Sequence, residues 1–117
     1  MKAAYFDCFS GISGDMCLGA VIDAGLDFSA LETALQGLAL SGYKLTATKV
    51  VKQGISAVKA DVLITDNTLH QPRGLAEITA IIEQSHFPEK VKDDALKVFR
   101  KLATAEARVH GVSVEAV

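Results

Sequence analysis

Hydrophobic residues recur with two different periods along this chain, and glycine-containing turns separate the segments. Residues 2–9 carry a short apolar run and predict a buried strand that stops at Ser10-Gly11. Residues 14–24 are apolar on almost every side, which is typical of a buried helix, and Gly25 is suited to the position after its end. Leucines on one side of residues 29–40 predict a second helix.

The middle of the chain has the period of a β-hairpin. Residues 43–51 alternate between apolar and polar side chains, and residues 58–64 alternate again after the turn signal Gln53-Gly54. Two such segments, joined by a short turn, predict an antiparallel hairpin.

The last part of the chain returns to a helical period. One helix is predicted over residues 74–84, and a longer one from Pro88, where proline is tolerated, to Gly111. The predicted core face of the long helix consists of Val91, Ala95, Val98, Phe99 and Leu102. The charged residues between them indicate a solvated face.

The order of these elements is β-α-α-β-β-α-α, which predicts an α+β fold. It consists of a small antiparallel sheet with helices packed on it, a ferredoxin-like pattern that lacks its last strand. We expect residues 1–117 to form a single domain. Because residues 112–117 stand where a further strand would begin, we also expect this to be the N-terminal portion of a larger protein.

Composition restricts the partners and the compartment. Hydrophobic residues make up 50% of the chain before glycine is counted, so we expect it to form a homo-oligomer or to dock on further protein. Apolar stretches are too short for a membrane span, and Asp7 and Asp15 interrupt any signal-peptide core. A formal net charge of −2 argues against nucleic acid as a partner. A cytoplasmic location follows, with Cys8 and Cys17 as free thiols.

The segment Asp7–Asp15 is the best candidate for chemistry. It joins the first predicted strand to a helix start, where unbonded amides and the positive end of the helix dipole favour an anion such as phosphate. The candidate phosphate-binding residues are Ser10, Gly11, Ser13 and Gly14. Asp7 and Asp15 are placed to hold a divalent cation that bridges to the phosphates.

A purely structural interpretation of this segment stays open. An acidic residue such as Asp15 in a first helical turn is stabilising without any ligand, and Ser13 can serve only as a cap. The spacing matches neither the P-loop nor GxGxxG. Asp7 is harder to explain in this way, because it ends an apolar strand beside a buried helix.

Three other residues are candidate metal ligands. His70 lies in a polar loop between Asp66 and Arg73, although an ordinary loop histidine is the alternative. His110 ends the long helix, where the dipole favours a cation. Cys8 is either a ligand or a small buried hydrophobe.

The run Asp-Cys-Phe-Ser-Gly-Ile-Ser-Gly-Asp-Met at 7–16 resembles the nickel-insertion protein (LarC) family of nickel-pincer nucleotide biosynthesis. Further similar segments follow in the family's order: Gly54-Ile55-Ser56-Ala57, Arg73 with Leu75 and Ile78, and Val109-His110-Gly111. The resemblance covers nearly the whole chain.

The resemblance implies a nickel chelatase of the lyase class, a cyclometallase that uses CTP with Mg²⁺ or Mn²⁺. Its substrate is pyridinium bisthiocarboxylate mononucleotide, and its product is the nickel-containing cofactor of lactate racemase. Asp7 and Asp15 are then the catalytic candidates. The candidate metal ligands are Asp7, Cys8, His70 and His110.

Two departures from the family limit this interpretation. Before its Arg-x-Leu segment the family often has a histidine-rich run, of which only His70 remains here. Family members also continue into a further domain, so we expect the isolated chain to be inactive. Two other functions stay open: a non-catalytic assembly module, and an unrelated magnesium-dependent phosphate-ester enzyme that uses Asp7 and Asp15.

Overall fold

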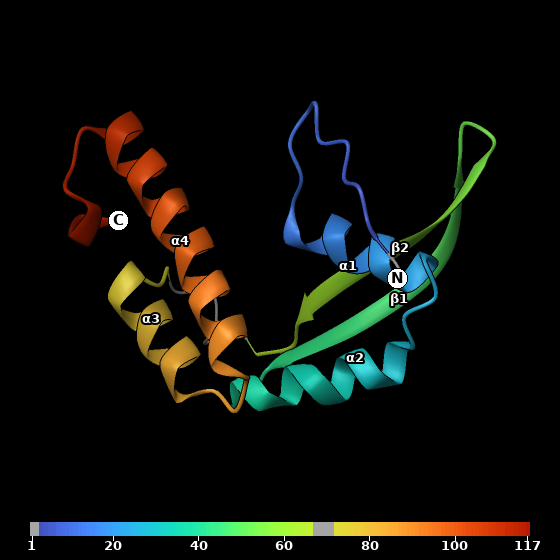
Figure 1. Cartoon of the computed structure of the whole chain (residues 1–117), viewed down its shortest axis with the longest axis horizontal. Coiled ribbons are helices and arrows are strands. Elements are labelled where there is room, and N and C mark those ends of the chain that lie inside the picture. The colour runs from blue at the N-terminus through green and yellow to red at the C-terminus, as the bar shows by residue number, and fades with distance from the viewer. Residues whose placement is uncertain (1–2, 67–71) are drawn as a thin grey trace. The chain divides into compact units, whose positions relative to one another are not determined.

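The structure is a computed structural model that describes residues 3–66 and 72–117. Its elements are α1 (Gly14–Asp23), α2 (Phe28–Leu35), the 3₁₀ turn η1 (Gln36–Leu38), β1 (Tyr43–Lys52), β2 (Ile55–Ile64), α3 (Leu75–Gln84), α4 (Glu89–His110) and the 3₁₀ turn η3 (Val114–Ala116). Figure 1 shows these helices and the two-stranded sheet. The predicted α+β class with a small antiparallel sheet is confirmed.

The chain divides into two compact units. Unit 1 consists of Met1–Glu32 and Tyr43–Thr65, and unit 2 of Thr33–Gly42 and Asp66–Val117. Unit 1 holds α1 and the hairpin, and unit 2 holds α3, α4 and η3. That the two units form a single domain stays a prediction.

The hairpin of unit 1 follows the sequence pattern closely. β1 and β2 pair antiparallel, with Tyr43 opposite Ile64 and Lys52 opposite Ile55. Gln53 and Gly54 both have positive φ, 53° and 81°, which is the turn geometry that matches the twist of two paired strands. The predicted hairpin and its turn are therefore confirmed.

Helix α1 packs on β2 through a glycine, as Figure 1 shows for the ribbon. Gly19 is buried, and a Cβ atom added to it would lie 2.5 Å from the backbone oxygen of Val58. The absence of a side chain at Gly19 thus lets the helix approach the strand backbone. At its C-terminal end, the Gly25 amide donates to Ile22 and the Leu26 amide donates to Val21, which confirms Gly25 as the residue after the helix.

The predicted first strand is wrong throughout its described part. Residues 3–9 form neither strand nor helix, and their side chains are exposed. Tyr5 is 90% exposed and Phe9 is 91% exposed. The apolar run indicates a preference for burial, but a strand also needs a neighbour for its backbone. Within residues 3–66 and 72–117, the sheet pairs only β1 with β2.

Helix α2 begins one residue earlier than predicted, and an aspartate caps it. The Asp27 carboxylate accepts hydrogen bonds from the Ala30 amide at 2.9 Å and from the Ser29 hydroxyl at 2.5 Å. Its α-helical part ends at Leu35, and the chain continues as η1 before Ala39 adopts a left-handed conformation with φ 51°.

In unit 2, α3 and α4 pack against each other, and η3 contacts both. The buried apolar residues are Ile82, Leu96, Ala103 and Ala107. The predicted core face of the long helix is wrong in part, because Val91, Val98 and Leu102 are exposed. α4 carries two apolar stripes, and periodicity alone does not indicate which of them meets a neighbour.

The described residues hold no helix that combines the length and the apolar character of a membrane span. The longest, α4, has 22 residues and carries charged side chains along its length.

Candidate functional site

The candidate segment Asp7–Asp15 lies in unit 1 and is exposed along its whole length. Its first part is a turn in which the Gly11 amide donates to the Cys8 carbonyl at 3.0 Å. Gly11 has φ +83°, a left-handed conformation that glycine adopts without strain. The Gly11 amide is therefore already bonded within the chain, and its role in the turn is established.

The second part of the segment is the start of α1. Ser13 occupies the N-cap position, where its carbonyl accepts the Cys17 amide at 3.1 Å. The Ser13 hydroxyl donates to the Asp15 carboxylate instead of capping the backbone. The predicted helix start at Ser13 and Gly14 is thus confirmed, but the serine acts on an acidic side chain.

Asp15 is a stable anion at neutral pH. The Ser13 hydroxyl lowers the pKa of Asp15 below its ordinary value of 3.8, and a hydrogen bond from the Met16 amide lowers it further. Lys59 contributes a smaller attraction in the same direction. Because the carboxylate already faces an amide of the helix start, a phosphate there would meet a negative charge. The geometry of Asp15 favours a cation more than an anion.

A hollow beside Asp15 connects the helix start with the hairpin. It has a volume of about 290 Å³, and its lining residues are Asp15, Met16, Val50, Lys52, Val58, Lys59 and Ala60. Lys59 Nζ lies 2.7 Å from Asp61 Oδ1, and this contact is the main cause that raises the pKa of Lys59. The hollow therefore combines a carboxylate with two ammonium groups over an apolar floor.

The sequence patterns give no sign of the two hairpin lysines as site residues. Alternation along β2 assigns Lys59 to the polar face, and β1 ends at Lys52. Only the packing of α1 on β2 brings Asp15 to these lysines, and no local spacing encodes that packing.

The predicted metal ligands lie in different parts of the chain. Asp7 and Cys8 are neighbours in the exposed segment of unit 1, and Cys8 is a free thiol. His110 is the last residue of α4 in unit 2, and His70 lies outside the described residues. Over residues 3–66 and 72–117, no three side chains of the His, Cys, Asp and Glu types gather closely enough to hold a metal ion.

Asp7 does not occupy the position for which it was singled out. The sequence predicts Asp7 at the end of a buried strand, but residues 3–9 form no strand. Its role therefore depends on its place beside Cys8 and on the motif, and it stays a prediction.

Comparison with known proteins matches this chain to one family. The family described as "Nickel insertion protein" matches residues 4–117. The pyridinium-3,5-bisthiocarboxylic acid mononucleotide nickel insertion protein of Desulfitobacterium hafniense is 50% identical over 117 residues, which are 100% of this chain and 29% of that protein. The protein of the same name from Geobacillus kaustophilus is 46% identical over 125 residues, which are 100% of this chain and 30% of that protein.

No solved structure matches the chain. The chain spans less than a third of the length of these relatives and corresponds to their N-terminal part. The match covers the Asp7–Asp15 segment, the hairpin and the long helix together. The chain therefore belongs to the nickel-insertion protein family.

Proposed function

We propose that this chain is the N-terminal portion of an enzyme that inserts nickel into pyridinium-3,5-bisthiocarboxylic acid mononucleotide. The observation that carries the proposal is the family match over residues 4–117, together with the names of the relatives. Nickel and the mononucleotide are then substrates of the complete protein.

The proposed reaction depends on CTP with Mg²⁺ or Mn²⁺. It forms carbon–nickel and sulfur–nickel bonds, belongs to the lyase class, and makes the cofactor of lactate racemase. A nucleotide and a divalent ion together need both cationic and anionic protein groups, and the hollow beside Asp15 offers both. The reaction is proposed to take place in the cytoplasm.

Within this reaction, Asp15 is proposed to hold the divalent ion. Its carboxylate is exposed and keeps its charge at neutral pH, because the Ser13 hydroxyl lowers its pKa. Lys52 and Lys59 border the same hollow, and Lys52 is proposed to attract phosphate oxygens, since the Lys59 ammonium is bonded to Asp61. Of the residues Ser10, Gly11, Ser13 and Gly14 beside them, Ser10 and Gly14 are the proposed phosphate donors, because the Gly11 amide is bonded to Cys8 and the Ser13 hydroxyl to Asp15.

Cys8 and the histidines are proposed to handle nickel. Thiolate and imidazole are ligands that suit late first-row metals, whereas carboxylate oxygen suits Mg²⁺ and Mn²⁺. Cys8 is exposed next to Asp7, so both side chains are accessible to an incoming ion. His70 and His110 are proposed to complete the ligand set.

The isolated chain is proposed to be inactive. In its described part no metal-holding cluster of three ligands forms, and the relatives are more than three times longer. Detectable nickel insertion by the 117-residue chain alone would contradict this statement.

The test uses a joined protein, in which this chain is followed by the part of the Desulfitobacterium hafniense relative that comes after the matched segment. Nickel, CTP and the mononucleotide are supplied, and the nickel-containing product is measured by mass spectrometry. Asp7→Asn is expected to abolish product formation while circular dichroism stays unchanged. If Asp7→Asn instead unfolds the protein, the Asp7 carboxylate has a structural role. If the unsubstituted joined protein forms no nickel-containing product, the proposed function is refuted.

A non-catalytic assembly module is the second candidate, and the exposed apolar residues of α4 favour it. Size-exclusion chromatography with light scattering, combined with CTP titration, separates the two. A chain that binds CTP as a monomer supports the enzyme, and an oligomer that does not bind CTP supports the module.

A further inference from the structure

Helix α4 has a second apolar stripe that the described part of unit 2 does not bury. We call the residues Val91, Val98, Leu102 and Val109 the outer stripe; they are 47%, 65%, 54% and 80% exposed. They are separated by seven, four and seven positions, the heptad spacing of a seam between packed helices. The stripe runs about 27 Å along the helix.

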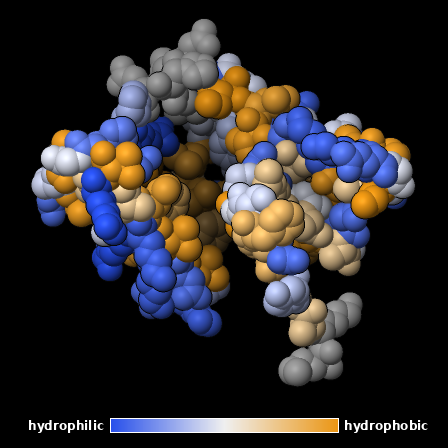
Figure 2. All heavy atoms as spheres, turned by 90° about the horizontal axis from the view of Figure 1, so that it is seen from above, coloured by the Kyte–Doolittle hydropathy of each residue, from blue (hydrophilic) through white to orange (hydrophobic). Residues whose placement is uncertain are grey.

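The outer stripe is distinct from the face that packs in unit 2. Leu96, Ala103 and Ala107 are 7%, 5% and 5% exposed and form the buried face. α4 is thus apolar on two adjoining sides, which is more than its contacts with α3 and η3 require. Figure 2 shows apolar side chains, in orange, reaching the molecular surface among hydrophilic ones. Large apolar side chains that lie exposed along one side of a helix are typical of an interaction site.

Positive charge borders the C-terminal half of the outer stripe. Lys101 and Arg108 are exposed, and within the described ranges neither forms an ion pair. Asp94, the acidic residue nearest the stripe on the same side, is already bonded to Lys90 and Lys97 at 3.1 and 3.2 Å. The border with Lys101 and Arg108 therefore has no unpaired carboxylate, and Glu106 lies on the opposite side of the stripe, where it lines a hollow together with Leu102.

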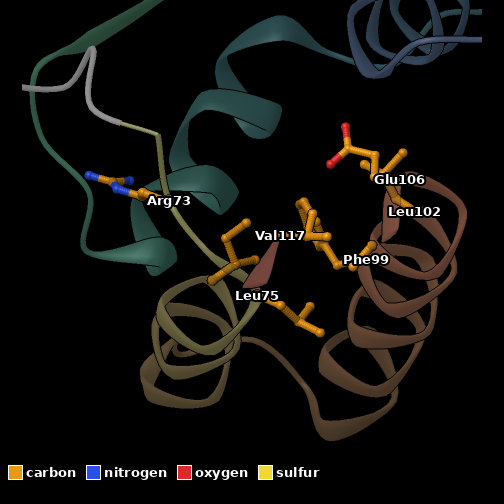
Figure 3. Close-up of a pocket in the computed structure, with 8 residues that line it drawn as sticks. Arg73, Leu75, Phe99, Leu102, Glu106 and Val117 are labelled. Atoms are coloured by element: carbon orange, nitrogen blue, oxygen red, sulfur yellow. The ribbon is translucent and has the colours of Figure 1, made fainter. Parts of the chain in front are cut away.

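The position of Val117 relates this stripe to the rest of the protein. Val117 lines a hollow of about 190 Å³ between α3 and α4, together with Leu75, Phe99 and Leu102. Figure 3 shows its side chain between those of Leu75 and Phe99, with Leu102 on the α4 side. The Leu75 amide also donates to the Val117 carbonyl at 3.4 Å. Leu102 thus belongs both to the hollow and to the outer stripe.

In the relatives, about two thirds of the protein or more lies outside the matched N-terminal part. A chain that continues from Val117 starts beside Leu102, at the edge of the outer stripe. We propose that the outer stripe is the docking surface for that following part of the protein. The docking segment is amphipathic, with apolar side chains toward Val98 and Leu102 and carboxylates toward Lys101 and Arg108.

Charge disfavours a second copy of the chain as the occupant. If two α4 helices packed antiparallel through their outer stripes, the side of one helix that carries Lys101 and Arg108 would face the same side of the other helix. Facing like charges are unfavourable and select against such a pair. An acidic segment from elsewhere in the protein has no such penalty.

The test measures how fast a cysteine in the stripe reacts with a maleimide. Val98→Cys is made in the 117-residue chain and in the joined protein, and mass spectrometry locates the label. Val51→Cys, at a valine that is 73% exposed in the hairpin, is the matched control. The label is expected to reach position 98 at least about tenfold more slowly in the joined protein, with no change at position 51.

Equal rates at position 98 in the two proteins would overturn the proposal. Slow labelling of position 98 in the isolated 117-residue chain would also overturn the proposal. A rate that falls as the protein concentration rises would indicate that a second copy covers the stripe. A rate that is independent of concentration would indicate that the chain itself covers it. Repeating the measurement in the complete Desulfitobacterium hafniense relative, at the aligned position, keeps the test decisive if the joined protein folds poorly. Labelling needs no nickel chemistry, so its failure is distinguishable from failure of the proposed function.

A charge reversal tests the chemistry of the occupant. In the joined protein that carries Val98→Cys, the pair Lys101→Glu and Arg108→Glu is expected to speed labelling at least about fivefold. The control pair, Lys44→Glu and Lys49→Glu, makes the same charge change in the hairpin and is expected to leave the rate unchanged. An unchanged rate with the first pair would refute the acidic docking segment.

Discussion

The starts of α1 and α2 are built from the same two residue types in opposite order. At α1, Ser13 precedes Asp15, and at α2, Asp27 precedes Ser29; in both, the serine hydroxyl bonds to the carboxylate. Asp27 also accepts the Ala30 amide, which is the ordinary function of a capping residue. Asp15 lies inside the first turn and borders a hollow with two lysines.

This difference separates a structural carboxylate from a candidate functional one. Capping accounts fully for Asp27, because its position lies outside α2 and it satisfies an amide of the first turn. It does not account for Asp15, since the N-cap position there belongs to Ser13. A lowered pKa is common to both residues and therefore does not by itself identify a site.

The largest expected effect is on activity. In the joined protein, Asp15→Asn is expected to reduce nickel insertion roughly 100-fold or more, because a neutral amide no longer balances the divalent ion. Asp27→Asn is the matched control and is expected to stay within about twofold, since Asn is an equally good cap. The rate of product formation is measured for both variants. An equal loss of rate in the two would contradict a functional role that is specific to Asp15.

The next largest effect is expected on stability, and it concerns the contact of α1 with β2 at Gly19. Gly19→Ala places a methyl group 2.5 Å from the Val58 oxygen, so it is expected to destabilise the chain by about 1–3 kcal/mol. Gly14→Ala is the control, because nothing lies within 4 Å of its added Cβ. Urea unfolding monitored by circular dichroism measures both. A Gly19→Ala variant as stable as Gly14→Ala would show that α1 does not rest on β2 in this way.

A smaller effect is expected on the stability of the Asp15 and Asp27 variants. Here the substitution of Asp27 is expected to have the larger effect, whereas the substitution of Asp15 has the larger effect on activity. Asp27→Ala removes the N-cap of α2, whereas Asp15→Ala removes a favourable charge and the bonds to the Ser13 hydroxyl and the Met16 amide inside the first turn of α1. The urea midpoint should therefore fall more for Asp27→Ala. A larger fall for Asp15→Ala would mean that this carboxylate is the more important structural residue.

The smallest expected effect is on titration. Both folded-state pKa values lie below 3.8, so each ionised carboxylate adds stability at neutral pH that is lost as the pH falls below that value. Ser13→Ala is expected to raise the pKa of Asp15 alone, and Ser29→Ala that of Asp27 alone. Carboxyl carbon chemical shifts followed by NMR report each value. An Asp15 pKa that does not respond to Ser13→Ala would contradict the hydrogen bond.

The elements that the sequence predicts well are those with local determinants. Alternation and the Gln53-Gly54 turn determine the hairpin, and Gly25 and Gly111 mark helix ends through left-handed backbone conformations. The predicted first strand, and the part of the predicted α4 core face that is exposed, are wrong for one reason. Apolar periodicity reports a preference for burial, while the partner that fulfils it is set by distant residues.

The candidate site shows the same limit. The motif at 7–16 and the helix start at Ser13 and Gly14 follow from the sequence, because a turn and a cap are encoded within a few residues. Lys52 and Lys59 join Asp15 only through the packing of α1 on β2. Side chains that meet through tertiary contacts have no fixed spacing, so no pattern in a single sequence identifies them.

The hydrogen bond between the Leu75 amide and the Val117 carbonyl has a mechanical consequence. It anchors Val117 to the first turn of α3, close to Arg73 and its ion pair with Glu77. Val117 is therefore attached to a helix and does not form a slack tail. A displacement or a rotation of Val117 would therefore be transmitted directly to the first turn of α3.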